Sequence, residues 1–270
     1  MKQYQIAFSK KDVADWAEFS GDYNPIHFDL DRVRKLGLQH MVVHGMLAIM
    51  PVKNTLSEQF NVAERIGWVT FKGMFSQPIP QDEAFPVNIS ERKGKLRFSV
   101  RNFSGDTEYL KGHFAQADNP LQEYANEEVV LSTDHISNQY MALFQQHYGI
   151  DYPLWIVLDN IVFADFVNSK VQPLKTIINP ENKTPTKIED SDETIMHLSH
   201  TVSFEPEFVE KLTFEELRSG AVSYEVVQPE LIRSEGNTVC SLTLLVKVGS
   251  KMCMLVQMKL IIKQPGYESR

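Results

Sequence analysis

The sequence predicts an α+β protein built from two copies of one unit, and three patterns carry that prediction. Apolar residues recur at helical spacing over residues 10–20, and a stretch that starts near Gly45 is apolar around most of its circumference, as in a buried helix. From about residue 67 to 117 the apolar period changes to two, which is typical of strands joined by tight turns. The same order returns after residue 137. We therefore expect two antiparallel sheets, each wrapped around one apolar helix and paired edge to edge.

The first predicted helix has a start signal and a stop signal. Ser9 and Asp12 have the spacing of a capping box, with Asp in place of the usual Glu, and Gly21 stands where a helix C-cap glycine belongs. The residues that follow, roughly 21–43, form a long loop with too many apolar side chains for disorder. Pro51 lies within the second predicted helix, so we expect a kink or a missing hydrogen bond there.

The second half is predicted to begin after an acidic, polar linker over residues 118–133. The expected domains are residues 1–130 and residues 131–270. Helices are predicted at residues 137–149 and 153–168, and an exposed insertion at residues 179–194. Strands follow in the segments HLSHTVSFE, GAVSYEVVQ, TVCSLTLLVKV and KMCMLVQMKLIIK.

Composition excludes several classes of protein. The 270 residues carry 27 Lys and Arg against 35 Asp and Glu, a formal charge of -8, which argues against nucleic acid as the main partner. The most apolar stretch is too short to cross a bilayer and is interrupted by Asp159 and Asp165. Cys240 and Cys253 are too few for a disulfide scaffold, and we expect buried, reduced thiols. No apolar leader is visible at the N-terminus, so a cytoplasmic protein without membrane association is expected.

The long loop carries the residues with chemical potential. Asp22 and His27 stand five apart, and Pro25 between them forces an extended, turning backbone. A carboxylate and a neutral imidazole brought together in this way can hold and deprotonate one water molecule. Gly45 opens the buried helix, where an unpaired N–H and the positive end of the helix dipole suit a carbonyl oxygen that gains negative charge.

The tetrapeptide FSGD has no weight by itself, because it occurs at residues 19–22 and again in a hairpin turn at 103–106. The longer pattern is specific: SGDYNPIH at residues 20–27 followed by HGML at 44–47 resembles the MaoC-like, (R)-specific enoyl-thioester hydratase and dehydratase family. Weaker similarity in VTFKGMFSQPIPQDE and YLKGHFAQA extends the resemblance over roughly residues 5–117.

The resemblance implies a fold and an activity. The family has the hotdog fold, and a chain of this length with two copies is similar to its double-hotdog members, which form a pseudodimer. Asp22 and His27 are then the catalytic pair, Asn24 shapes the loop, and the Gly45 amide binds the thioester carbonyl. The implied reaction is reversible hydration of a trans-2-enoyl thioester to an (R)-3-hydroxyacyl thioester in fatty-acyl metabolism. The implied partner is acyl-CoA or an acyl carrier protein thioester, and no cofactor is needed.

Two residues depart from the family pattern, and the second half departs entirely. Lys53 occupies a register where the family often has a small or hydroxyl side chain, and it can pair with a nearby acid, while Pro51 interrupts the central helix. Residues 131–270 lack the motif, so we expect a degenerate hotdog that completes the fold. Its apolar helix residues are expected to be core: Trp155, Ile156, Leu158 and Ile161.

Alternatives remain open at this point. A thioesterase on the same fold would also use a carboxylate and water, and a non-catalytic acyl-binding or accessory subunit would need neither. His44 is expected to anchor the loop, and His40 to face solvent or the entrance. A metal site drawn from Asp22, His27, Asp29 and Asp31 fails the calcium-loop template, so none is expected. Two basic clusters, one at residues 32–35 and one at 92–97, are candidates for contact with carrier phosphates or an acidic carrier protein. With both hotdogs in one chain, a monomer or homodimer is expected.

Overall fold

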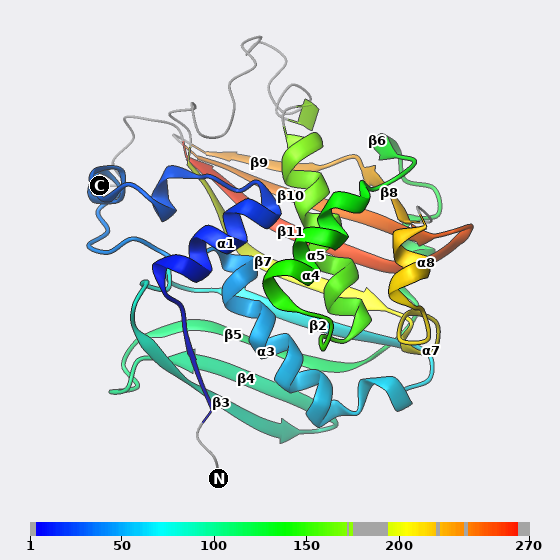
Figure 1. Cartoon of the computed structure of the whole chain (residues 1–270), viewed down its shortest axis with the longest axis horizontal. Coiled ribbons are helices and arrows are strands. Elements are labelled where there is room, and N and C mark those ends of the chain that lie inside the picture. Colours follow the sequence, from blue (N-terminus) through cyan, green and yellow to red (C-terminus); the bar gives the residue numbers. More distant parts are fainter. Residues whose placement is uncertain (1–3, 172, 175–193, 220–221, 235–236, 264–270) are drawn as a thin grey trace.

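Within the described residues the strands form one 11-stranded sheet, with the long helices packed against a single face of it (Figure 1). The computed structural model describes residues 4–171, 173–174, 194–219, 222–234 and 237–263. The strand order is β1-β3-β4-β5-β2-β7-β11-β10-β8-β6, with β9 paired to β10. All pairings are antiparallel, as the sequence predicts.

The first half follows the predicted order closely. Helix α1 (Lys10–Ser20) and the buried helix α3 (Gly45–Phe60) are separated by a long loop, which contains the short helices η1 (Pro25–His27) and α2 (Leu30–Lys35). Strand β1 (Tyr4–Ala7) precedes them, η2 (Val62–Glu64) follows α3, and the other strands are β2 (Trp68–Phe75), β3 (Ala84–Arg92), β4 (Lys95–Arg101) and β5 (Glu108–Ala117). Helix α3 continues through Pro51, and the Thr55 hydroxyl donates to the Pro51 carbonyl over 3.1 Å.

The second half repeats this order with additions. Helices α4 (Asn138–Tyr148) and α5 (Leu154–Ser169) agree with the prediction, as do β7 (Thr194–Phe204), β8 (Val222–Val227), β10 (Asn237–Val248) and β11 (Lys251–Lys263). Two short helices and one strand were missed: α7 (Pro206–Val209), α8 (Phe214–Arg218) and β9 (Glu230–Ser234). The predicted insertion at 179–194 lies outside the described residues except for its last position.

The prediction of a plain linker over residues 118–133 is wrong. This segment contains η3 (Pro120–Tyr124) and β6 (Val129–Thr133), which pairs with β8 and forms one edge of the sheet. The apolar pair Leu121 and Tyr124 packs on the outer face of the sheet against Val227, Leu245 and Leu255. Backbone pairing and this small apolar cluster therefore overrode the polar composition that predicted a linker.

The two halves are joined by the pairing of β2 with β7, which makes their sheets continuous. From this junction the strand order runs outward in the same way on both sides, β2-β5-β4-β3-β1 and β7-β11-β10-β8-β6. Both central helices, α3 and α5, lie on the inner face of the sheet, and their apolar side chains form one continuous core (Figure 1). The edge-to-edge pairing predicted from the sequence is confirmed.

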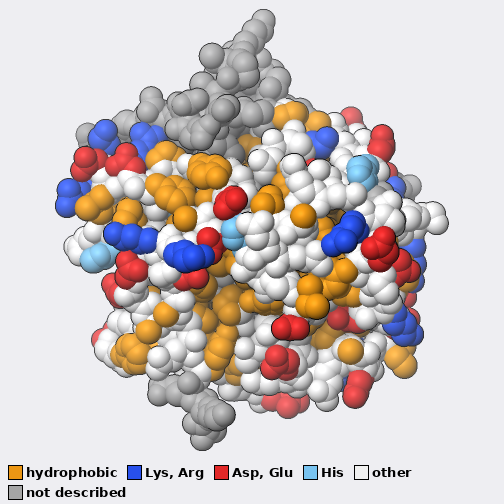
Figure 2. All heavy atoms as spheres, in the orientation of Figure 1, with side chains coloured by type: hydrophobic (Ala, Val, Ile, Leu, Met, Phe, Trp, Pro, Cys, Tyr) orange, Lys and Arg blue, Asp and Glu red, His pale blue; other side chains and the backbone are white. Residues whose placement is uncertain are grey.

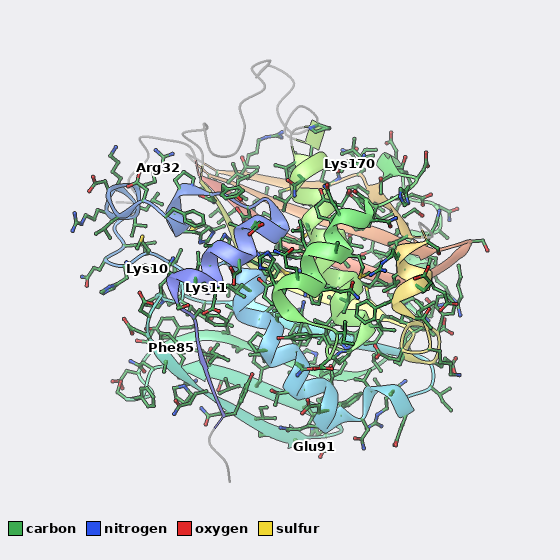
Figure 3. All side chains as sticks on the ribbon, viewed as in Figure 1. Lys10, Lys11, Arg32, Phe85, Glu91 and Lys170 are labelled. Carbon is green, nitrogen blue, oxygen red and sulfur yellow. The ribbon has the colours of Figure 1, made fainter. Side chains whose placement is uncertain are left out.

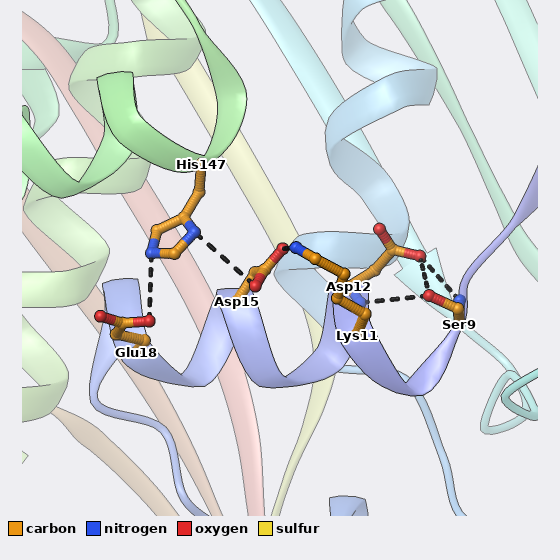
Figure 4. A network of polar contacts seen from close by, with 6 residues as sticks. All are labelled: Ser9, Lys11, Asp12, Asp15, Glu18 and His147. Carbon is orange, nitrogen blue, oxygen red and sulfur yellow. Dashed lines mark hydrogen bonds and ion pairs between the residues drawn. The ribbon is translucent and has the colours of Figure 1, made fainter.

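Helix α1 is fixed at both ends and bridges to the second half. The predicted capping box is present, with Ser9 Oγ accepting from the Asp12 amide and Gly21 in the left-handed conformation at φ 69°. Figure 4 shows the face of α1 that meets α4, where His147 lies 3.7 Å from Asp15 and 3.4 Å from Glu18. The space between helices and sheet is filled by side chains such as Phe85, labelled in Figure 3, which packs edge-on against Tyr109.

The surface over the helices carries charges of both signs, scattered over the face rather than gathered in one patch (Figure 2). Among the described residues, no helix has the length and apolar character needed to cross a membrane.

Candidate active site

The long loop between α1 and α3 is an ordered structure. Asn24 caps η1, with Oδ1 accepting from the Ile26 amide over 3.4 Å, and Nδ2 donates to the Ile195 carbonyl over 3.0 Å. Because Ile195 belongs to β7, this side chain ties the loop of the first half to the sheet of the second half. Asp29 caps α2 by accepting from the amides of Asp31 and Arg32.

His27 is buried and its ring orientation is fixed. Its Nδ1 lies 2.9 Å from the Val42 carbonyl. Since a carbonyl only accepts, Nδ1 carries the hydrogen, and in neutral His27 the lone pair is on Nε2. Gln81 supports the same arrangement, because its Nε2 donates to the carbonyls of His27 and Val42 over 2.8 and 3.1 Å. Gln81 was not predicted, since a glutamine in the turn between β2 and β3 has no distinctive sequence signal.

His44 anchors the loop, as predicted. Its Nε2 donates to the backbone carbonyl of Asp22 over 2.8 Å, and its ring stacks on that of His27 with centroids 3.6 Å apart. Burial lowers the pKa of His44 well below its usual value, and the neighbouring His27 lowers it further. Two stacked imidazoles tolerate at most one positive charge, so the pair favours neutral rings near pH 7.

Asp22 stands beside His27 at the edge of the cavity, half-buried. One carboxylate oxygen, Oδ1, accepts from the Asn24 amide over 3.2 Å, which leaves the other oxygen free to hold a ligand. Burial lowers the pKa of His27, while the negative charge of Asp22 partly offsets that effect. A proton taken up by His27 would therefore be stabilised by Asp22.

Gly45 is the first residue of α3, and its predecessor His44 makes no side-chain cap there. The N–H groups of a first helical turn have no partner within the helix. A Cβ atom on Gly45 would stand 3.1 Å from the Phe75 ring and 3.4 Å from the His197 Cβ. A side chain here would occupy the space through which a ligand reaches the backbone.

These residues meet at one cavity of about 220 Å³. Asp22, Asn24, His27 and Gly45 line it together with residues of β2 and the segment after it. Both halves supply the apolar wall, and the second half contributes to it from α5, β7, β10 and β11: Phe163, Phe166, Val167, Ile195, Met196, Leu198, Cys240, Met258, Leu260 and Ile262. Trp155, Ile156, Leu158 and Ile161 do not line the cavity and are buried in the core, as predicted.

The corresponding helix end in the second half is already filled. Glu210 accepts from the backbone amides of Leu154 and Trp155 over 3.3 and 3.0 Å, at the first turn of α5. A carboxylate therefore occupies the place where the first half leaves the Gly45 amide without a side-chain cap. The loop before α5 is short, residues 149–153, so it has no room for an equivalent of the segment that carries Asp22 and His27.

Lys53 pairs with an acid, as the sequence analysis anticipated. Its ammonium contacts the carboxylate of Asp159, and both side chains are 0% exposed. His200 Nε2 lies 2.9 Å from the same carboxylate, so Asp159 on α5 contacts one residue of α3 and one of β7. Burial alone would raise the pKa of Asp159, but the facing His200 imidazole and Lys53 ammonium lower it to about 2. The pair links the two central helices through a fully buried charge contact.

One cluster among the described residues has the composition of a metal site: Asp22, His27 and His44, each offering a ligand atom within 4.8 Å of the others. The combination considered from the sequence is not assembled, because Asp29 is occupied as the cap of α2 and Asp31 is exposed. One nitrogen of each histidine in this cluster already makes a hydrogen bond to a backbone carbonyl.

Known proteins are similar to this chain in sequence over its first half and in fold over both halves. Residues 1–110 match the family model described as the MaoC like domain. The first 110 residues of the chain are therefore similar to a MaoC-like domain. Over 110 residues it is 42% identical to the mitochondrial 3-hydroxyacyl-[acyl-carrier-protein] dehydratase of Arabidopsis thaliana, which covers 38% of this chain and 64% of that protein. The match thus spans less than two thirds of the relative's length.

Solved structures resemble both halves of the chain together. A MaoC domain protein dehydratase from Chloroflexus aurantiacus superposes with a TM-score of 0.53 at 8% identity, covering 97% of this chain and 94% of that one. A Mycobacterium tuberculosis protein with a double hotdog fold gives a TM-score of 0.53 at 9% identity, with coverage of 97% and 94%. At such identities the likeness concerns the fold. The predicted double hotdog is confirmed.

Proposed function

We propose that this protein catalyses the reversible hydration of trans-2-enoyl thioesters to (R)-3-hydroxyacyl thioesters. The observation that carries the proposal is that Asp22, His27 and Gly45 line one cavity, which continues between apolar side chains of the second half. The domain in residues 1–110 and the dehydratase relative support a hydro-lyase. We assign residues 1–130 as the catalytic half and residues 131–270 as a degenerate half.

The proton transfers follow from the fixed ring of His27. Its Nδ1–H is held by the Val42 carbonyl, so Nε2 is the base that accepts a proton from a water held with Asp22. As the water oxygen bonds to C3, the C2–C3 double bond opens and C2 receives the proton from Nε2. One water is consumed, its oxygen and one hydrogen become the hydroxyl, and its other hydrogen ends on C2. Delivery from a single imidazole places both additions on the same face of the substrate.

The Gly45 amide acts on the other end of the reacting system. During addition the thioester carbonyl oxygen gains enolate character, and an N–H at the positive end of a helix stabilises that charge. Loss of one such donor typically costs 10²–10³-fold in kcat. Asn24, which ties the loop to β7, keeps Asp22 and His27 in position relative to this helix end.

The acyl chain is assigned to the part of the apolar wall that the second half supplies. The carrier is coenzyme A or an acyl carrier protein, and the basic residues near α2 and around the β3–β4 hairpin are the candidates for its phosphates or its acidic surface. The Arabidopsis dehydratase is named for its carrier protein and for mitochondria. Carrier and cellular location of the present protein remain predictions.

The test is hydration of crotonyl-CoA and of a medium-chain trans-2-enoyl-CoA, followed by loss of the conjugated enoyl absorbance together with a free-thiol assay. Asp22→Asn and His27→Ala should each lower kcat/KM at least ~100-fold. His40→Ala is the matched control, since His40 is an exposed histidine of the same loop, and it should retain full activity.

The product and the thiol decide between activities. Chiral analysis should give the (R)-3-hydroxyacyl thioester without free thiol. Thiol release abolished in both variants would move the assignment to a thioesterase. If neither acyl-CoA nor the corresponding carrier-protein thioesters react, the protein is an acyl-binding or accessory subunit instead.

A further inference from the structure

A buried chain of polar side chains leads from the core to the cavity wall in the second half. Asp159 contacts the Lys53 ammonium and lies 2.9 Å from His200 Nε2. The ring of His200 meets that of His197 edge-on, with centroids 5.4 Å apart and planes at 88°. His197 lines the cavity, whereas His200, Asp159 and Lys53 do not. The proposed hydration mechanism uses none of these four residues.

The proton on His200 is fixed by its acceptor. Asp159 is ionised, since its buried carboxylate faces the Lys53 ammonium and the His200 imidazole. A carboxylate only accepts, so His200 donates from Nε2. In neutral His200 the other nitrogen, Nδ1, is then a bare acceptor, and it is buried with no hydrogen-bond partner among the described residues. Both imidazoles favour the neutral form, because burial lowers their pKa values and, for His200, outweighs the opposing charge of Asp159.

His197 has a complementary atom. Its Nε2 is likewise buried and without a partner in the described part of the chain. Because neither nitrogen has a partner among the described residues, the two are not directly hydrogen-bonded, and a hydrogen on His197 Nε2 would serve the acceptor Nδ1 of His200 through one water molecule. The opposite tautomer would leave two bare lone pairs of adjoining rings buried and unsatisfied, which is costly in a low-dielectric interior. The hydrogen of His197 therefore belongs on Nε2.

The consequence for the cavity is a hydrogen-bond acceptor. With Nε2 carrying the hydrogen, the Nδ1 lone pair is the polar group that His197 can offer to a ligand. Its ring is held by stacking on Phe75 and Phe163, with centroids 5.2 and 6.0 Å away. Its Cβ lies 3.4 Å from the position that a Cβ of Gly45 would occupy. This acceptor is thus close to the helix end assigned to the thioester carbonyl.

We propose that His197 is a specificity-determining residue which accepts a hydrogen bond from the bound thioester through Nδ1, and that His200, Asp159 and Lys53 are positioning residues which fix its tautomer. The assignment rests on the proposed function for the identity of the ligand as a thioester. The favoured ligand carries an O–H or N–H group close to the thioester carbonyl. Two sources have that chemistry: a hydroxyl on the acyl chain, and the amide of the carrier arm.

The first experiment compares three substitutions at one position. His197→Asn keeps a polar group where Nδ1 stands, His197→Gln moves it to the place of Nε2, and His197→Leu removes it at similar size. Each variant is assayed with crotonyl-CoA and with a hydroxylated acyl-CoA. We expect the Leu and Gln variants to raise KM about 10-fold or more with at least one of these substrates, while the Asn variant stays within about threefold of the parent protein. If all three variants match the parent protein with both substrates, or if Gln retains activity and Asn does not, the proposal is wrong.

The substrate arms separate the two sources of the donor. A crotonyl thioester of a simple alkyl thiol has no amide, so the penalty of His197→Leu should vanish with it if the carrier arm is the donor. If a hydroxyl of the acyl chain is the donor, the penalty should instead appear only with a hydroxylated acyl-CoA. A penalty of equal size with every substrate would mean that His197 contacts no donor, and would overturn the proposal.

The second experiment reads the tautomer without activity. In ¹⁵N-labelled protein, the imidazole nitrogen shifts of His197 should report a neutral ring with hydrogen on Nε2. In Asp159→Asn the amide donates to His200 while its oxygen faces Lys53, so the hydrogens of both imidazoles should move to Nδ1. A hydrogen on Nδ1 of His197 in the parent protein would refute the proposal that His200, Asp159 and Lys53 fix its tautomer. No change of the tautomer in Asp159→Asn, once its native fold is verified by the backbone spectrum, would refute it as well.

The two experiments also keep the two proposals apart. Failure of Asp22→Asn and His27→Ala to lower hydration would refute the proposed function and leave the tautomer result standing. Loss of hydration in those variants together with a hydrogen on Nδ1 of His197 would refute only the present inference.

Discussion

Removing one member of the Lys53–Asp159 pair should destabilise the protein far more than removing both. Each side chain is 0% exposed, so either single substitution leaves a charge without its counter-ion in the core. Breaking such a pair from one side typically costs about 3–5 kcal/mol in the free energy of unfolding. Lys53→Met and Asp159→Leu should each lose about that amount. The double variant K53M/D159L should lose about 1–3 kcal/mol, the cost of leaving the His200 N–H without an acceptor.

The assay is a double-mutant cycle by urea denaturation at pH 7, with the four proteins compared under identical conditions. A coupling energy of about 3 kcal/mol or more is expected, because the double variant leaves no buried charge without a counter-ion, whereas each single variant leaves one. The reasoning fails if the double variant is as unstable as the sum of the single variants. It also fails if Lys53→Met costs less than about 1 kcal/mol, since the ammonium would then not be compensating a buried charge.

Four further outcomes are expected. Stability should fall as pH drops from about 7 to 5, because burial lowers the pKa of His27, His44, His197 and His200 in the folded protein. Below the unfolded histidine pKa of ~6.5, the unfolded chain takes up protons that the folded protein does not, and this favours unfolding. Melting temperatures across that range measure the effect, and a flat profile would contradict it. Gly45→Ala should lower kcat/KM about 10–100-fold with less than about 1 kcal/mol change in stability, as its Cβ would stand against Phe75; unchanged kinetics would remove Gly45 from the site. Glu210→Ala should lose about 1–3 kcal/mol while hydration is retained, because two amides of α5 lose their acceptor; loss of activity with intact stability would be inconsistent with that role. Cys240 should resist iodoacetamide at pH 8 until the protein unfolds, as burial raises its thiol pKa to about 12; mass spectrometry of the native protein tests this, and rapid labelling would show an open thiol.

Much of the fold was predictable because its signals are local. The capping box at Ser9, the glycine after α1 and the change of apolar period near residue 67 depend on neighbouring residues alone, and the structure agrees with each. The repeated order of elements was sufficient to predict that two sheets pair edge to edge. Short elements were missed where their stability comes from distant partners, as with β6, which follows a polar, acidic segment and pairs with β8.

The candidate site likewise combines residues that lie close together in the sequence, which could be predicted, with distant ones, which could not. The residue set Asp22, His27 and Gly45 was visible because it lies within one loop and the helix it leads to, whereas Gln81 and His197 reach the site from elsewhere in the chain. Sequence reasoning flagged Lys53 as out of place but had no means of naming its partner, which lies 106 positions away. Contacts between halves are set by the β2–β7 junction, and no local pattern encodes them.

The two central helices start differently, and this has a consequence for local opening. The first turn of α5 holds its amide hydrogens on Glu210, while Gly45 at the start of α3 has no side-chain cap from His44. In native-state hydrogen exchange the Trp155 amide is therefore protected and the Gly45 amide is exposed to exchange, although both lie at the start of a helix in the core. The first turn of α3, which is left open for a ligand, should therefore exchange its amide hydrogens before the first turn of α5 does. A bound thioester would slow exchange at Gly45 specifically.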